Sequence, residues 1–118
     1  MLVDVAIYGK LAHLLGGKFV ATQEISLPDN AKVKELYSLI GIYPEETSYV
    51  FINAVLSDMP GLHVVLEDEL HDGDHIGIFS VGYMWPYQYR EGAAISRRVQ
   101  TALAERGALQ HSTKPIIP

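Results

Sequence analysis

The stretch Leu66–Phe79, LEDELHDGDHIGIF, decides the fold, because a turn signal in it leads directly into an apolar strand. Asp72-Gly73-Asp74 is typical of a turn, since glycine accepts backbone conformations that other residues avoid and aspartate caps its own backbone. The following run, Ile76–Gly82, is predicted to be the last strand of a sheet. A chain of 36 more residues follows Gly82, so the end of this strand is not the end of the chain.

Working back from this strand, the sequence predicts three further strands and a helical turn. Val50–Asn53 is apolar throughout and is expected to be central in the sheet. Val3–Tyr8 alternates as a strand with one buried face does, and Lys10–Leu15 forms a short helical turn before the strand Phe19–Leu27. The residues of this last strand expected to share one side are Phe19, Ala21, Ile25 and Leu27.

A helix is predicted between these strands. Pro28 stops the preceding strand, and Asp29 or Asn30 can cap the helix N-terminus with a side-chain oxygen. Gly41 is a C-terminal stop. The apolar stripe facing the sheet is expected to consist of Val33, Leu36, Leu39 and Ile40.

The remaining segments before the last strand are expected to be mostly irregular. Ile42–Tyr49 reads as a loop, Ser57–Gly61 as a break, and Leu62–Leu66 as a short strand beyond it. Strands, a helix and then further strands predict an α+β fold, with the helix packed on one face of a mixed sheet.

Composition indicates one compact unit. A chain of 118 residues with 48% hydrophobic residues can build one core. It contains no cysteine, which excludes disulfides, thiolate-bound clusters and a cysteine nucleophile. No run approaches the roughly 20 apolar residues of a membrane span, and Met1–Asp4 lacks the basic start of a signal peptide. We therefore expect a cytoplasmic protein that does not enter a membrane.

Charge is unevenly distributed. Residues 1–89 hold 4 Lys and Arg against 12 Asp and Glu, a net of −8, while residues 90–118 hold 5 against 2, a net of +3. A body of that charge repels phosphate, which argues against nucleic acid as a ligand. The basic tail is expected to lie on the acidic body or to meet an acidic partner.

The chain resembles the small β-grasp, ubiquitin-like sulfur carriers of the ThiS/MoaD type over about its first two-thirds. The resemblance rests on segments in the family's order and spacing, namely Val3–Tyr8, Leu11–Gly16, Leu27–Val33, Val50–Asn53 and Leu66–Phe79. It implies a β-grasp domain over 1–82 with one packed helix, followed by an extension over 83–118.

The resemblance also implies a carrier rather than an enzyme. In such carriers an E1-type activating enzyme adenylates a terminal glycine carboxylate, and sulfur then replaces the adenylate to give a thiocarboxylate. The expected setting is molybdopterin, tungstopterin or thiamine-type sulfur transfer. No cofactor is expected on the chain itself, and its partner would be the activating enzyme or a cofactor-synthesis protein.

Gly82 is the candidate carrier end. The stretch that matches the family's terminal Gly-Gly is Ser80–Trp85, which contains one glycine followed by bulky residues. Two small residues suit a narrow channel that brings the backbone close to a nucleotide, and Tyr83 would obstruct it. The carrier interpretation therefore needs cleavage after Gly82. The alternative is that Gly82 merely ends the strand, in a binding or oligomerisation module that has lost the reactive end.

An aromatic arm follows Gly82. Tyr83, Trp85, Tyr87 and Tyr89 recur at a spacing of two, so in an extended chain all four side chains point to one side. Three interpretations are open: the arm covers a sheet surface of its own domain, it docks on a partner, or it stacks on nucleic acid with Arg90 nearby, and the net charge of −8 on the body weighs against the last. The first two both hold in a homodimer with exchanged arms. The residues expected to contact a partner are Phe79, Tyr83, Trp85, Tyr87 and Tyr89.

Beyond the arm, an amphipathic helix of about three turns is predicted, ending at Gly107. Its apolar stripe consists of Ile95, Val99, Ala102 and Leu103. No catalytic residues are assigned, since Ser80 lacks the glycine-flanked turn of a hydrolase nucleophile. His71 and His75 lie among acidic residues at the turn, but a metal site needs three or four converging ligands, and we interpret this region as a solvated turn without metal.

Overall fold

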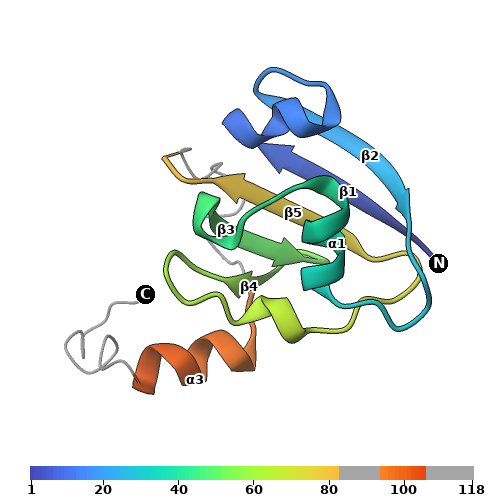
Figure 1. Cartoon of the computed structure of the whole chain (residues 1–118). Helices are drawn as coiled ribbons and strands as arrows, with labels where there is room; N and C mark the ends of the chain where they lie inside the picture. Colours follow the sequence, from blue (N-terminus) through green and yellow to red (C-terminus); the bar gives the residue numbers. More distant parts are fainter. Residues whose placement is uncertain (83–93, 106–118) are drawn as a thin grey trace.

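The computed structural model describes residues 1–82 and 94–105, which form one mixed sheet with helices against it (Figure 1). The strand order is β2-β1-β5-β3-β4-β6. The strands are β1 (Leu2–Tyr8), β2 (Val20–Ser26), β3 (Thr47–Ile52), β4 (Val55–Asp58), β5 (His75–Ser80) and β6 (Ala94–Ile95). The helical elements are η1 (Lys10–Leu15), α1 (Val33–Ile40), η2 (Pro44–Glu46), η3 (Val65–Glu67) and α3 (Arg97–Glu105).

The sheet order is that of a β-grasp. β1 and β2 form an antiparallel hairpin, β5 runs parallel to β1 at the centre of the sheet, and β3 lies antiparallel to β5 on its other side. α1 connects β2 to β3 and packs on one face. The predicted α+β β-grasp with one packed helix is therefore confirmed. No helix in the described ranges is long and apolar enough to cross a membrane.

The main core lies between the sheet and α1. Alternate residues of the central strands point into it, as the period of a strand requires. They are Val3, Val5 and Ile7 from β1, Ile76 and Ile78 from β5, and Val50 from β3, each at most 1% exposed. Val33 and Leu36 of α1 pack against these strand side chains in the same core. Burying side chains of this size is worth about 1.5–3 kcal/mol each, which makes this interface the chief source of stability.

The buried side of α1 differs from the predicted stripe. Leu39 is 62% exposed, and Tyr37 is buried in its place. The predicted N-cap, Asp29 or Asn30, is also wrong, because Lys32 is the N-cap of the helix. The Lys32 N–H donates to the Glu35 carboxylate, and Asn30 adopts a left-handed conformation before the helix. Gly41 ends the helix with a φ of 98°, as predicted.

Three further expectations are corrected by the structure. Phe19, expected on the buried side of the second strand, is 72% exposed, because it precedes β2 in the turn after η1. Leu62–Leu66 contains no strand but leads into η3. The break predicted at Ser57–Gly61 contains the end of β4, and the loop predicted over Ile42–Tyr49 contains the start of β3.

A buried carboxylate closes the loop after β4. Asp58 is 2% exposed and accepts hydrogen bonds from the backbone N–H groups of Met59, Val64 and Val65. Burial raises the pKa of Asp58, while these donors oppose that shift by stabilising the charged form. The same residue types that read as a turn in the sequence therefore form a strand end with an internal anchor.

The chain returns to the sheet after Gly82. β6 pairs in parallel with β4, and the Ser96 N–H donates to the Leu56 carbonyl at 2.8 Å. α3 follows, and Val99 on it is fully buried, as its place on the predicted apolar stripe implies. The sequence did not predict β6, because two residues are too few to show the alternation of apolar and polar residues that indicates a strand.

Candidate functional site

The end of β5 is held firmly up to Val81. Ser80, which is 1% exposed, donates its hydroxyl to the Tyr8 carbonyl at 2.8 Å and accepts the Leu11 N–H at 2.9 Å. The Ser48 hydroxyl donates to the carbonyls of Phe79 and Ser80, both at 3.1 Å. The Ser80 hydroxyl is thus enclosed and engaged with backbone, which is a structural role and not that of a nucleophile.

Gly82 stands just beyond this anchor. The Val81 N–H donates to the Glu46 carbonyl at 3.0 Å, and Gly82 is exposed with a φ of 87°. That conformation is in the left-handed region that favours glycine. A Cβ at this position would have no heavy atom within 4 Å, so the backbone conformation and not crowding requires the glycine. The strand end therefore delivers Gly82 to the surface.

The face of the sheet opposite α1 carries a second, aromatic cluster. We call it the open-face cluster: Phe51, Leu56 and Phe79, with the partly buried Tyr8, Tyr49 and Met59 packed against them. The Tyr8 and Phe79 rings stack at 4.5 Å between centroids, and Phe51 meets Phe79 edge to face at 5.8 Å. Both arrangements are favourable for aromatic pairs.

Phe79, one of the residues expected to contact a partner, lies in the open-face cluster. Its side chain is 0% exposed and stacks on the Tyr8 ring. Its contact with a partner stays a prediction. The other expected contacts, Tyr83, Trp85, Tyr87 and Tyr89, lie outside the described residues.

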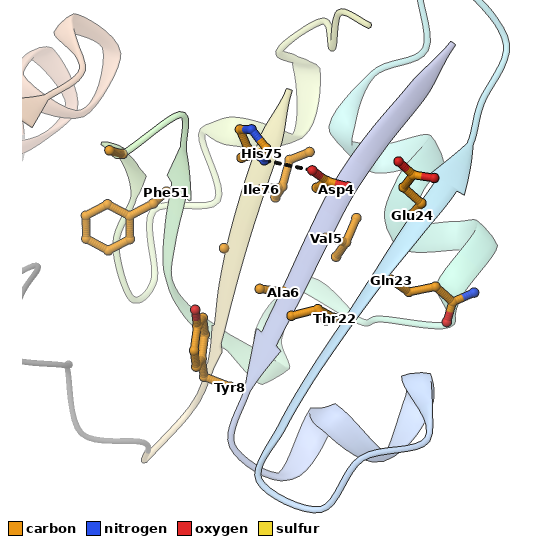
Figure 2. Close-up of a pocket in the computed structure, with 12 residues that line it drawn as sticks. Asp4, Val5, Ala6, Tyr8, Thr22, Gln23, Glu24, Phe51, His75 and Ile76 are labelled. Carbon is orange, nitrogen blue, oxygen red and sulfur yellow. Dashed lines mark ion pairs between the residues drawn. The ribbon is translucent and has the colours of Figure 1, made fainter. Parts of the chain in front are cut away.

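Next to the cluster, the same face is hollowed over β1 and β5, as Figure 2 shows. The hollow holds about 560 Å³, with Ala6 and Gly77 as small residues in its lining and Tyr8 at one end. At the other end the His75 Nδ1 lies 3.0 Å from an oxygen of Asp4, and both side chains are more than half exposed. Sequence reasoning missed this hollow, since its lining comes from four strands, β1, β2, β3 and β5, whose registers the sequence does not give.

The lining of the hollow is acidic. Asp4 and Glu24 contribute carboxylates, and among the described residues of the lining only His75 can carry positive charge. Such a surface favours cationic or neutral polar groups over phosphate. The hollow is thus a poor fit for a phosphate group.

The acidic turn before β5 uses its carboxylates internally. Asp74 accepts the His71 N–H and the Asn53 side-chain amide, at 2.8 and 3.0 Å. Asp72 accepts the Leu2 N–H at 2.7 Å. Within residues 1–82 and 94–105, no three His, Asp or Glu side chains are grouped so that they could hold a metal ion.

Comparison with solved structures finds a structural likeness, whereas comparison with family models and curated proteins finds none. Among solved structures, it is similar to the protein from Pyrococcus furiosus described as "Putative molybdopterin converting factor, subunit 1", with a TM-score of 0.48 and 23% identity. The similarity covers 68% of this chain and 97% of that one. The β-grasp assignment accordingly rests on the strand order of this chain itself.

Proposed function

We propose that this chain is the precursor of a sulfur carrier of the ThiS/MoaD type, with the carboxylate of Gly82 as its reactive end after cleavage of the Gly82–Tyr83 bond. The observation that carries the proposal is the strand end: β5 is anchored through Val81, and Gly82 follows it exposed. A carrier needs a rigid body and a short projecting end, and this geometry supplies both.

The chemistry would come from a partner enzyme. The freed carboxylate attacks ATP to form an acyl-adenylate and releases pyrophosphate, and a sulfur nucleophile then displaces AMP to leave a thiocarboxylate. The chain contributes the carboxylate and the surface that docks on an E1-type activating enzyme. The destination of the sulfur is molybdopterin, tungstopterin or thiamine-type synthesis, and the site of action is the cytoplasm.

The deciding measurement is the intact mass of the protein recovered from its native cells with proteases inhibited. A species ending at Gly82, with sulfur in place of one terminal oxygen, is expected. Recovery of the full chain alone would overturn the carrier assignment.

A matched pair of glycine variants tests the role of the end itself. Gly82 and Gly73 share a φ of 87°, and neither has a heavy atom within 4 Å of a built Cβ. Gly82→Ala and Gly73→Ala therefore carry the same kind of backbone strain. Loss of thiocarboxylate in Gly82→Ala and its retention in Gly73→Ala are expected; equal behaviour of the two would refute a special role for Gly82.

A second function is favoured by the return of the chain to the sheet. β6 pairs with β4, and Val99 of α3 is fully buried, so residues 94–105 pack on the domain as part of it. A non-catalytic binding or oligomerisation module would keep such an extension permanently. If the chain is such a module, only the full-length chain is expected in cells. The Gly82→Ala variant should still bind its partner, and deletion of residues 83–118 should abolish that binding.

A further inference from the structure

β2 (Val20–Ser26) forms an unprotected edge of the sheet. It is the last strand on its side, and it pairs with β1 in one unbroken register along its whole length (Figure 1). It contains no proline, and Glu24 is its one charged residue. Soluble proteins commonly protect such edges with proline, bulges, several charges or a very short strand. The opposite edge follows that rule, since β6 has two residues, whereas β2 does not.

Alternate residues of β2 point their backbone groups away from β1. Met1 and Leu27 exchange two hydrogen bonds, at 2.8 and 2.9 Å, and the Gly9 N–H donates to the Phe19 carbonyl at 2.7 Å. Bonded and non-bonded pairs alternate along an antiparallel ladder, so the odd-numbered residues of β2 bond to β1. The even-numbered residues therefore direct their N–H and C=O groups outward, where no strand of the described part of the chain pairs with them. They are Val20, Thr22, Glu24 and Ser26.

Exposed apolar side chains gather beside this edge. Phe19 is 72% exposed and Val20 is 47% exposed where β2 begins. Leu39 of α1, which is 62% exposed, lines a hollow of about 330 Å³ between α1, η1 and β2. The other apolar residues in this lining are Leu14, Leu15, Ile25 and Ile40. Open backbone groups next to uncovered apolar side chains are typical of an edge to which another strand adds.

The sequence of β2 is complementary to a second copy of itself. In antiparallel pairing about a twofold axis at Gln23, Thr22 faces Glu24 of the second copy, and Val20 faces Ser26 of the second copy. All the outward residues then lie in bonded pairs. A shift by two residues in either direction leaves an outward residue of β2 outside the ladder. The symmetric register also sets Glu24 against a threonine hydroxyl, which can donate to it, and not against the other Glu24.

We propose that two copies of this chain pair antiparallel along β2, about a twofold axis at Gln23, and so join their sheets into one. This axis is perpendicular to the sheet, so α1 of both copies lies on the same face. The hollow beside Leu39 then adjoins the α1-facing side of the second copy's β2. The inference goes beyond the proposed function and does not depend on it, because no residue of this interface belongs to the carrier end. The dimer is expected whether or not the chain is cleaved after Gly82.

Charge placed on the twofold axis tests the pairing in the full-length chain. Gln23 is exposed and faces its own copy, so Gln23→Glu or Gln23→Lys sets two like charges opposite each other. In sedimentation equilibrium the unmodified chain is expected to be a dimer that dissociates on dilution. Each variant alone should dissociate about fivefold more readily, which is the repulsion of two unit charges about 4 Å apart in water. An equimolar mixture of the two variants should regain the affinity of the unmodified chain, because opposite charges then face each other.

Gln100→Glu and Gln100→Lys are the matched controls. They make the same changes to the same residue type at an exposed position of α3, which packs beside β4 and not beside β2. They should leave the dissociation constant unchanged, and circular dichroism shows whether each variant is folded. A chain that is monomeric at every concentration, a dimer that the Gln23 variants do not weaken, or a mixture that dissociates as readily as either variant alone would each overturn the proposal.

Amide hydrogen exchange gives a second readout with controls inside the same strand. The N–H groups of Thr22 and Glu24 point outward, whereas those of Ala21 and Gln23 point to β1. All four amides are expected to be protected at concentrations where the chain is a dimer. On dilution, Thr22 and Glu24 should lose protection and Ala21 and Gln23 should keep it. Fast exchange at Thr22 and Glu24 in the dimer contradicts pairing along β2.

Discussion

The hydroxyl of Ser80 offers the sharpest test of how the strand end is built. Ser80→Ala removes the acceptor of the Leu11 N–H and the donor to the Tyr8 carbonyl in a site that is 1% exposed. A buried donor left without a partner costs about 1–3 kcal/mol. Because alanine is too small to restore either contact, we expect a loss of about 2 kcal/mol in the free energy of unfolding.

Urea unfolding followed by far-ultraviolet circular dichroism measures this loss. With a shift of about 4–8 °C per kcal/mol for a domain of this class, the melting temperature should fall by about 10 °C. The Leu11 amide should also exchange with solvent faster. Ser26→Ala is the matched control, since Ser26 is exposed at the end of β2, and such sites change stability by about 0.5 kcal/mol or less. If Ser80→Ala behaves like this control, the strand end is not anchored as described.

Three further outcomes are expected. Burial raises the pKa of Asp58 in the folded protein. Its contribution to the free energy of unfolding is therefore present below the ordinary aspartate pKa of about 4 and is lost as pH rises through the raised pKa. Asp58→Asn should remove this pH dependence from unfolding free energies measured over a series of pH values. A Cβ at Gly77 meets only ordinary contacts at 3.9 and 4.0 Å, whereas one at Gly17 lies 2.5 Å from a backbone oxygen, so thermal melts should show Gly17→Ala to be much the more destabilising of the two. The Lys34 ammonium holds the pKa of Glu67 below its usual range at an exposed site, and Glu67→Gln should therefore change stability little, by an amount that disappears at high salt.

The strands at the centre of the sheet could be read from the sequence because their burial follows a simple period. Val3, Val5 and Ile7 alternate, and the turn at Gly73 marks where the last strand begins. The helix was found for the same reason, but its buried side was not. Leu39 and Tyr37 are both compatible with a helical stripe, and only the docking angle of α1 decides that the tyrosine is buried.

The parts that escaped prediction depend on contacts distant in sequence. Asp58 reads as a turn residue, and its burial becomes acceptable only because three backbone N–H groups of the following loop converge on it. β6 pairs its two residues, Ala94 and Ile95, with β4, which would otherwise be an edge strand, and the sequence does not show which distant segment pairs there. The hollow over Gly77 likewise requires the registers of β1, β2, β3 and β5 to be known together.

The position of β6 bears on both proposed functions. If a protease cuts after Gly82, the fragment that follows is still held by the pairing with β4 and by the burial of Val99. Cleavage alone therefore does not remove the extension; the fragment must also dissociate, which exposes the edge of β4 and the apolar surface beneath α3. A carrier matured this way needs a partner that covers these surfaces, whereas a binding module keeps them covered permanently. The carrier assignment thus predicts that the cleaved body is isolated in complex with a second chain, which is either its own released fragment or its enzyme partner. A cleaved body that is stable and monomeric by itself would contradict that reasoning.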